Sequence, residues 1–470
     1  MTRFLGRAAG LCLAVCMLWP GRTLVAAAVC ILTLTCPAGA AGPHAGSQQH
    51  GLNEYLYCPS ITGKVYQYRI GRDGTLEPLK PPFVAAGRPV DRVFIRPGAR
   101  FAYVPGRGVI LQYRISNDGT LKPVGAAPPP AMIFETFVLS RDRRNAYGLT
   151  GDTGRIFQYV IAGDATMAPL RPTYIATGHG QCWGMALSGN GRAAYVASSD
   201  GSVSQFRVAA DGRLNALTPA AVPAAPGKGS VMALDVSFDA TGRYAYVTSV
   251  GKARHAPGFL STFRVGHSGR LTNVSTQEAP PYSLAYCHSG MLVVRGGGEV
   301  RQYRIGPGGR LSPMGEPIDV GGALSTFAFT PDGRFAYAAI NETLREGHVA
   351  EFHFRADGGL ERLPESASIP GDSSGGIFVD PSGRFAYTVC AGVRQATIGQ
   401  FKIGPSGVLT PLNPPSLPQS PYTGSLTFVR LPAPPAKQAP KTKGKAGAKP
   451  AARGTAGLKR SAGKGARKRR

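Results

Sequence analysis

The sequence predicts an all-β protein, an eight-bladed β-propeller of four-stranded antiparallel blades that spans residues 51–432. Three observations predict it. One strand pattern recurs eight times at nearly constant spacing, each copy is accompanied by further strand patterns in the same order, and one strand pattern is left over at the end. The 63 glycines and 40 prolines among 470 residues fit many tight turns rather than long helices.

The recurring strand is a three-residue phrase that usually ends in Ala-Tyr. Its third residues follow one another at intervals of 44 to 51 residues. The copy at 290–292 is degenerate, and the count of eight blades depends on it. The eight copies lie at residues 55–57, 101–103, 145–147, 193–195, 244–246, 290–292, 335–337 and 385–387.

Each copy is followed by a strand with a Gln-aromatic pair, as at Gln67-Tyr68, and then by a hairpin such as Asp73-Gly74. Asp-Gly supplies the positive φ that tight hairpins need. An inner strand precedes each copy and ends in a Gly/Arg turn, as at residues 331–334. The order is therefore inner strand, Ala-Tyr strand, Gln-aromatic strand and outer strand.

The first copy lacks an inner strand, whereas the last copy is followed by an additional strand pattern at residues 424–430. We expect this C-terminal strand to complete blade 1 and so to close the ring. Closure hides the two sheet edges that an open array of blades would expose.

Residues 1–40 are predicted to be a signal peptide, followed by a linker at 41–50. Arg3, Arg7 and Arg22 are their only charges, apolar stretches lie at 11–19 and 23–35, and small residues follow at 37–41. An uncleaved anchor is the alternative, although the apolar stretches are short for a membrane span. The protein is accordingly expected to be secreted or periplasmic.

Residues 433–470 are predicted to be a disordered basic tail, with thirteen Lys or Arg and no Asp or Glu. We expect the tail to bind anionic envelope polymers or lipid head groups; a solvated tail that aids solubility is the alternative. Sequence-specific nucleic-acid binding is not expected, because no aromatic residues are interleaved for base stacking. Of the net charge of +27, the tail contributes +13 and the first forty residues +3, which leaves +11 on residues 41–432.

Outside the predicted signal peptide the chain has Cys58, Cys182, Cys287 and Cys390, with no Cys-x-x-Cys or Cys/His cluster. No metal site and no cofactor are therefore expected. Cys58 and Cys390 occupy equivalent strands of neighbouring blades and could form a disulfide. Four buried thiols are the favoured interpretation.

Candidate functional residues gather in the loops of one propeller face, where strands two and three are joined and where each blade leads to the next. There a carboxylate with imidazole and guanidinium groups could provide a general base and an oxyanion stabiliser for lactone hydrolysis. Solvated loop charges are the alternative. The opposite face, made of short Gly/Arg and Asp-Gly turns, is expected to be structural. The candidates are Glu342, Arg345 and His348 as catalytic residues and His179, Arg254, His255, Asp372 and Arg394 as ligand-binding residues.

The repeat resembles the β-propeller lactonase family, the 6-phosphogluconolactonase-like or YVTN-type propellers. The likeness lies in residues 327–337 followed by Asn341-Glu342, and in the outer hairpin at 68–76. The resemblance implies that Glu342 is an active-site residue. The chain departs from the family at Thr326, where members carry an arginine, in lacking a His-x-His strand with its Asp-Leu-Gly loop, and in having eight blades rather than seven.

These observations favour a monomeric, exported binding or interaction scaffold whose basic tail tethers it to a polyanion. The alternative is a lactone hydrolase that acts on a small-molecule lactone with Glu342 as its base. A third, weaker possibility is a polyanion-binding protein in which the tail is the main active element.

Overall fold

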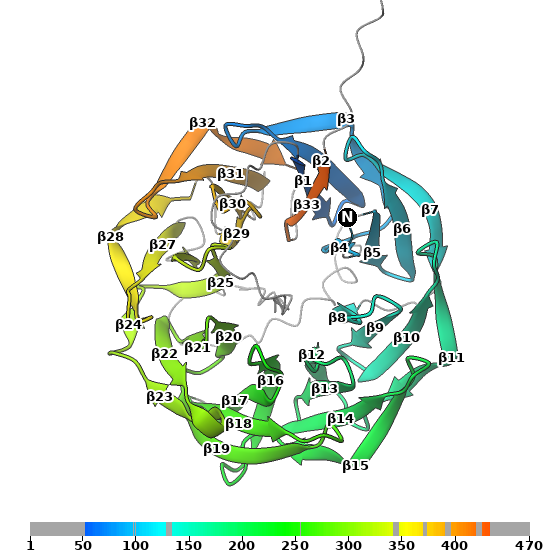
Figure 1. Cartoon of the computed structure of the whole chain (residues 1–470), viewed down its shortest axis with the longest axis vertical. Helices are drawn as coiled ribbons and strands as arrows, with labels where there is room; N and C mark the ends of the chain where they lie inside the picture. Colours follow the sequence, from blue (N-terminus) through cyan, green and yellow to red (C-terminus); the bar gives the residue numbers. More distant parts are fainter. Residues whose placement is uncertain are drawn as a thin grey trace, which may run out of the picture. The chain divides into compact units, whose positions relative to one another are not determined.

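The chain folds into a ring of eight antiparallel sheets, as Figure 1 shows for the computed structural model. The structure describes residues 52–96, 98, 100–127, 134–253, 255–341, 347–369, 374–390, 396–419 and 425–432. The prediction of an all-β, eight-bladed propeller is confirmed. The segments predicted to be signal peptide, linker and basic tail lie outside the described residues.

Blades 1 to 4 each have four strands. Blade 1 combines the last strand of the chain with the first three. From the inner strand outward in each blade, the strands are β33 (Thr427–Pro432), β1 (Leu52–Ser60), β2 (Lys64–Ile70) and β3 (Leu76–Ala85); β4 (Phe94–Ile95), β5 (Phe101–Gly106), β6 (Val109–Ile115) and β7 (Leu121–Ala127); β8 (Phe134–Leu139), β9 (Asn145–Thr150), β10 (Arg155–Ile161) and β11 (Met167–Ala176); β12 (Cys182–Leu187), β13 (Ala193–Ser198), β14 (Ser202–Val208) and β15 (Leu214–Pro223).

Blades 5 to 8 follow the same order, except that two short strands, β23 and β24, share the outer edge of blade 6. The elements are β16 (Val231–Phe238), β17 (Tyr244–Gly251), β18 (Gly258–Val265) and β19 (Leu271–Ala279); β20 (Leu284–His288), β21 (Met291–Gly296), β22 (Glu299–Ile305), the 3-10 turn η1 (Pro307–Gly309), β23 (Leu311–Pro313) and β24 (Ile318–Asp319); β25 (Ala323–Phe329), β26 (Phe335–Asn341), β27 (Gly347–Phe354) and β28 (Leu360–Ser368); β29 (Ser374–Val379), β30 (Phe385–Cys390), β31 (Ala396–Ile403) and β32 (Leu409–Gln419).

The C-terminal strand closes the ring as predicted. β33 pairs antiparallel with β1, from Leu52 opposite Pro432 to Tyr57 opposite Thr427. The strand begins at Thr427 and continues to Pro432, so it lies slightly later in the chain than the predicted segment. Both described ends of the chain consequently meet in blade 1.

The degenerate copy is a true blade, but its register corrects the sequence alignment by one residue. Val293 lies opposite Gln302, in the same way that Tyr337 lies opposite Glu351. Val293, and not Leu292, therefore takes the place of the tyrosine. The reason is the tight turn before β21, where His288 pairs with Met291 and Gly290 adopts a φ of +78°, so Gly290 belongs to the turn.

Two buried side chains per blade connect most neighbouring blades. In blade 8 the Tyr387 hydroxyl donates to the Gly74 carbonyl oxygen at 2.7 Å, and the Gln400 Oε1 accepts from the Leu76 N–H at 2.8 Å. This contact joins the last blade to the first with the hydrogen bonds used inside the ring. Equivalent tyrosine bonds come from Tyr57, Tyr103, Tyr147, Tyr195 and Tyr337.

The junction between blades 5 and 6 lacks this pair of bonds. Thr262 stands where other blades have glutamine, and neither its Oγ1 nor the Tyr246 hydroxyl hydrogen-bonds to any part of the chain that the structure describes. In blade 7 the substitution is conservative, because Glu351 Oε2 accepts the Leu409 N–H at 3.2 Å.

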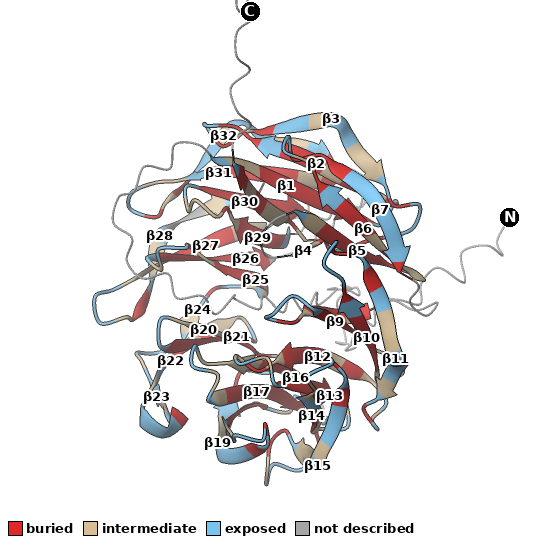
Figure 2. Cartoon of the chain, turned by 45° about the vertical axis from the view of Figure 1, so that its right-hand side comes forward, coloured by how far each residue is buried: buried red, intermediate tan, exposed pale blue. Residues whose placement is uncertain are grey.

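Most of the core lies between adjacent blades, and Figure 2 shows the buried residues following the strands. One cluster, for example, packs Leu56 and Cys58 of blade 1 against Tyr387 and Val389 of blade 8. A four-stranded sheet alone cannot bury both faces, so this stacking supplies the hydrophobic stabilisation.

Cys58, Cys182, Cys287 and Cys390 are all thiols. The favoured interpretation of four thiols is thus confirmed and the alternative disulfide between Cys58 and Cys390 is not formed. The expectation that all four are buried is wrong for one of them: Cys58, Cys182 and Cys390 are buried, whereas Cys287 in β20 is only half-buried. Among the described residues no helix is long and apolar enough to cross a bilayer.

Candidate functional site

The two faces of the ring differ in their connections. We call "turn face" the face with the short turns that join strands one and two and strands three and four, such as residues 331–334 and 71–75. We call "loop face" the opposite face, which carries the connections between strands two and three and between blades. The antiparallel pairing of every blade fixes this assignment.

Three of the sequence-predicted site residues are described, and all three lie at the loop face. His179 lies between β11 and β12, His255 between β17 and β18, and His348 is the second residue of β27. They belong to the connections of different blades, and no described contact joins them. The remaining candidates, Glu342, Arg345, Arg254, Asp372 and Arg394, lie outside the described residues.

His179 forms a short contact with a carboxylate that the sequence alone did not indicate. Its Nδ1 lies 2.5 Å from Oδ2 of Asp200, in the turn between β13 and β14. The other oxygen, Asp200 Oδ1, accepts from the N–H and hydroxyl of Ser202 at 3.1 and 2.6 Å. Partial burial raises the pKa of Asp200, but the hydrogen bonds from Ser202 and His179 outweigh it and leave that pKa below its usual value.

The His179–Asp200 pair has a geometry suited to general-base chemistry. A carboxylate on Nδ1 orients an imidazole and leaves Nε2 to exchange a proton. The nearby Cys182 is not poised as a nucleophile, because burial raises the pKa of its thiol. A shallow cavity of about 360 Å³ adjoins the pair; it is lined by Asp200, Gly201, Ser202, Ala221, Val222, Pro223, Ala225, Gly229 and Val231.

Asp235 is a buried carboxylate in one of the innermost strands. Asp235 follows a β-bulge in β16, at the position that Thr136 and Thr326 occupy in blades 3 and 7. Its side chain fits because Gly184 faces it, where a Cβ would come within 2.9 Å of Oδ1. Asp235 is 8% exposed, and its Oδ1 accepts no hydrogen bond from the described residues.

Burial raises the pKa of Asp235 to about 6, although its backbone hydrogen bond to Val236 and the charge of Arg295 act in the opposite direction. The Arg295 guanidinium itself donates to the carbonyl oxygens of Leu324 and Ser325. Sequence reasoning missed Asp235, although a charged residue in an otherwise apolar inner strand was a usable signal.

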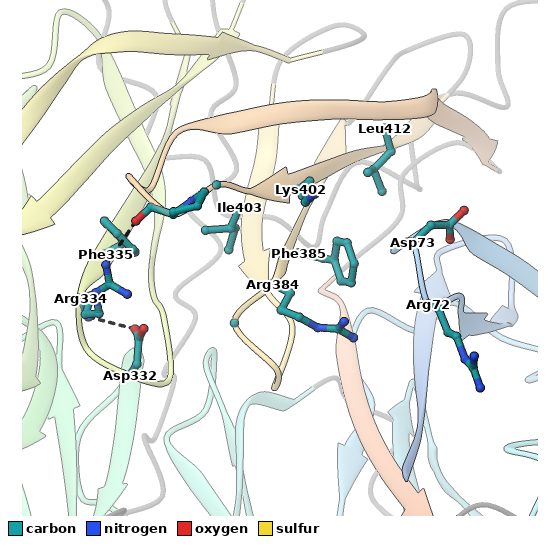
Figure 3. Close-up of a pocket in the computed structure, with 13 residues that line it drawn as sticks. Arg72, Asp73, Asp332, Arg334, Phe335, Arg384, Phe385, Lys402, Ile403 and Leu412 are labelled. Atoms are coloured by element: carbon teal, nitrogen blue, oxygen red, sulfur yellow. Dashed lines mark hydrogen bonds between the residues drawn. The ribbon is translucent and has the colours of Figure 1, made fainter. Parts of the chain in front are cut away.

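A cavity lies on the turn face, between blades 7, 8 and 1 (Figure 3). We call it the turn-face groove; its volume is about 660 Å³. Four cations and two carboxylates line it, together with two phenylalanine rings. These charged and aromatic residues are Arg72, Arg334, Arg384, Lys402, Asp73, Asp332, Phe335 and Phe385.

Two of the arginines stack on the phenylalanine that follows them in sequence. The guanidinium carbon of Arg384 lies 5.1 Å from the Phe385 ring centroid and that of Arg334 lies 4.9 Å from the Phe335 centroid. Stacking orders the planar group. Arg334 also donates to the Pro405 carbonyl oxygen and Arg384 to the Ser382 hydroxyl, each at 3.2 Å, and the remaining N–H donors of the two guanidinium groups can serve a ligand. Figure 3 shows the Arg384 side chain extending toward the Arg72-Asp73 turn of blade 1.

The groove carboxylates are engaged by the turns that contain them. Asp73 Oδ1 accepts the hydroxyl and the N–H of Thr75 at 2.7 and 3.0 Å, and these bonds hold the pKa of Asp73 below its usual value. Asp332 accepts in the same way from the Thr330 hydroxyl at 2.6 Å. The cations that face the groove are therefore only partly compensated, and the site is suited to an anion.

No family model matches the sequence, and no curated protein matches it. Solved structures do match. The periplasmic gluconolactonase of Pseudomonas aeruginosa is 21% identical with a TM-score of 0.53, over 68% of this chain and 98% of that one. A 6-phosphogluconolactonase-like protein of Bacteroides fragilis is 16% identical with a TM-score of 0.52, over 82% and 99% of the two chains.

Sqt1 of Chaetomium thermophilum also reaches a TM-score of 0.53, at 13% identity over 71% of this chain and 88% of that one. Because its score equals that of the gluconolactonase, the structural likeness shows a shared propeller fold and nothing narrower. The fold that the lactonase-family resemblance implied is confirmed, and function must be argued from the site.

Proposed function

We propose that this chain is an exported, non-catalytic binding propeller whose turn face holds anionic groups. The expected ligands are the phosphate or carboxylate groups of anionic envelope polymers or lipid head groups. The observation that carries the proposal is the turn-face groove, where Arg72, Arg334, Arg384 and Lys402 meet against only two carboxylates.

The chemistry of the groove supports an oxygen anion as its ligand. Guanidinium forks match carboxylate and phosphate geometry through paired N–H donors, whereas a lysine adds a mobile point charge. A volume of about 660 Å³ falls in the range of small-ligand sites, roughly 300–1,000 Å³. The groove can therefore hold one charged unit of a larger polymer or surface.

The basic tail is proposed as a second attachment to the same class of ligand. The last described residue, Pro432, pairs with Leu52 at the turn-face end of blade 1. The thirteen Lys or Arg of residues 433–470 are thus joined covalently to the propeller at the face that carries the groove. Both elements would act through charge, so their binding should weaken as salt rises.

The groove is tested by the double variant Arg384→Ser/Lys402→Ser, with retention on immobilised heparin measured in rising salt. We expect affinity to fall on the order of tenfold, because two charge-assisted contacts are lost. The matched control is Arg107→Ser/Lys228→Ser, which removes two exposed cations from the loop face.

A control variant that loses as much retention as the groove variant would contradict the proposed site. Deleting residues 433–470 from the wild type and from the groove variant separates the two attachments. We expect the deletion to weaken retention in both proteins, the wild type and the groove variant. If the groove substitutions have no effect with or without the tail, the groove is rejected as a binding site.

A second candidate function is lactone hydrolysis, favoured by the His179–Asp200 pair at 2.5 Å. His179 Nε2 would take a proton from water as the hydroxide attacks the lactone carbonyl carbon. The ring C–O bond then breaks, and the imidazolium returns the proton to the leaving alkoxide, which yields the hydroxy acid. Glu342, the base implied by the family resemblance, remains the alternative base.

Turnover of gluconolactone and 6-phosphogluconolactone, measured as the release of acid, decides between these functions. Hydrolysis that is lost in His179→Gln or in Glu342→Gln would replace the binding proposal with an enzyme and would identify its base. No hydrolysis above the rate in buffer, together with salt-sensitive retention, is the result expected of a binding propeller.

A further inference from the structure

Arginine recurs at one position of the turn face around the ring. It directly precedes the recurring phrase of strand two in six of the eight blades, and every copy is exposed. Blade 1 has Glu54 at this position and blade 6 has Gly290. The six residues, which we call the arginine ring, are Arg100, Arg144, Arg192, Arg243, Arg334 and Arg384.

A second set of cations lies beside the first on strand three. The register places these residues opposite the first residue of the recurring phrase, and all are exposed. Blade 3 has Val160 at this position and blade 7 has His353. The set consists of Arg69, Arg114, Arg207, Arg264, Arg304 and Lys402.

The arginine ring is not needed to neutralise the turns. Within the described part of the chain, none of its six guanidinium groups forms an ion pair. Arg100 and Arg334 instead donate to neutral oxygens, Asn117 Oδ1 at 2.6 Å and the Pro405 carbonyl at 3.2 Å. Nearby aspartates such as Asp73 and Asp164 accept hydrogen bonds within their own turns. Arg243 and Arg384 each donate one N–H to a hydroxyl of their own turn, but a guanidinium has five N–H donors, so others remain for a ligand.

The loop face shows no such pattern. In blades 2 to 5 the described residues of its turns between strands two and three include Arg107, Asp152, Asp200 and Lys252 at unrelated positions, and Arg254 follows in the sequence of the last turn. The turn face therefore differs from the loop face in carrying cations that recur at fixed positions, although Asp142, Asp239, Asp332 and Asp380 share its turns. A charge distribution of this kind orients a protein in an electric field or beside a charged surface.

Both described ends of the chain open on the turn face, because Leu52 pairs with Pro432 at that end of blade 1. The basic tail at 433–470 follows Pro432, and the N-terminal segment with its apolar stretches precedes Leu52. Whichever of these segments contacts a membrane, its attachment point lies on the face with the arginine ring.

We propose that the turn face lies flat against an anionic bilayer, with the arginine ring bound to lipid phosphate groups; this rests on the proposed function and names its partner. A plane engages the arginines of opposite blades together, whereas a linear polymer reaches only an arc of the ring at once. Each Lys or Arg near an anionic membrane strengthens binding by a factor of about five, so the ring acts collectively.

The test uses the full-length protein and vesicles of phosphatidylcholine with phosphatidylglycerol, and measures cosedimentation. The triple variant Arg144→Ser/Arg192→Ser/Arg243→Ser removes arginines from blades 3 to 5, across the ring from the groove. We expect its partition coefficient to fall on the order of 100-fold, about fivefold for each arginine. The matched control, Arg107→Ser/Lys228→Ser/Lys252→Ser, removes three exposed loop-face cations and should bind like the wild type.

Equal losses in the two triple variants would overturn the proposal, because binding would then follow total charge and not one face. Retention on heparin without binding to the anionic vesicles would overturn it in favour of a polymer. If only Arg384→Ser/Lys402→Ser loses binding, the proposed function stands and the flat docking does not. Binding to vesicles of phosphatidylcholine alone, unchanged in the turn-face triple variant, would also contradict it.

Discussion

The turn face and the loop face of this propeller are built by the same strands but differ in what the repeat requires of them. On the turn face the same residue types return in blade after blade, and buried tyrosines such as Tyr387 donate to the turn of the next blade. On the loop face the connections differ in length and charge, and one of them holds the His179–Asp200 pair.

Under the proposed function, a regular surface is both structural and functional. Glycines and aspartates of the turn face are explained by backbone conformation and turn hydrogen bonds. The exposed arginines beside them form few ion pairs, among them Arg213 with Asp211 and Arg355 with Asp357, so most of their positive charge is left uncompensated. The expectation that function lies only on variable loops overlooks charges that are repeated by the architecture.

The largest expected effect comes from a matched pair of glycines, one on each face. Gly74, on the turn face, has a φ of +91° and an added Cβ would lie 2.2 Å from the Phe385 ring, whereas Gly87, on the loop face, has a φ of +67° and open space around it. Gly74→Ala should lower the free energy of unfolding by about 3–5 kcal/mol, from strain and overpacking together. Gly87→Ala should cost about 1–2 kcal/mol, from strain alone.

Urea unfolding of both variants measures the two costs. Equal losses of unfolding free energy in the two variants would show that the turn face is no more tightly packed than the loop face, contrary to the difference described above.

The innermost strands, which run between the two faces, give the next effect through Asp235 of β16. Its pKa of about 6 in the folded protein exceeds the ordinary 3.8, so folding favours the protonated carboxyl and the protein loses stability as pH rises toward and through 6. Asp235→Asn removes this penalty. Two pKa units correspond to about 3 kcal/mol, so above pH 7 the variant should be more stable than the wild type by about 2–3 kcal/mol.

Near pH 3, where the carboxyl is protonated in both states, the two proteins should differ little. Unfolding measured across this pH range checks the prediction. A stability difference between variant and wild type that does not change with pH would show that burial does not favour the protonated form of Asp235.

A smaller effect separates the regular junctions of the ring from the irregular one. Tyr387→Phe removes the hydroxyl that donates to Gly74 across the closing junction and should cost about 1–2 kcal/mol. Tyr246→Phe removes a hydroxyl that finds no partner among the described residues, so it should be neutral or slightly stabilising. Thermal unfolding of the pair measures the difference, and equal shifts would remove the distinction between these junctions.

The blade count and the closing strand could be predicted because hairpin chemistry and strand patterns are local and were repeated eight times. The register at blade 6 could not, because Met291, Leu292 and Val293 replace the usual phrase with three interchangeable apolar residues. His179 could be predicted as a site residue because it lies in a loop before an inner strand. Its partner Asp200 lies in another segment, the turn between β13 and β14. Only the folded chain brings the two together.

The turn-face groove was missed for a related reason. Its residues come from three blades, including the first and the last, so no sequence window contains them. The repeated arginines were visible in the sequence, but deciding that they share one exposed face required the strand pairing. Glu342, Arg345, Arg254, Asp372 and Arg394 lie outside the described residues and remain predictions.

Chemical footprinting of arginines tests the central claim most directly. Phenylglyoxal modification of the wild-type protein, read by mass spectrometry with and without phosphatidylglycerol-containing vesicles, reports which side chains the membrane covers. The account predicts protection of Arg100, Arg144, Arg192, Arg243, Arg334 and Arg384, while Arg88 and Arg107 on the loop face remain as reactive as in solution. Equal protection of Arg88 and Arg107, or no protection of the arginine ring, would contradict it.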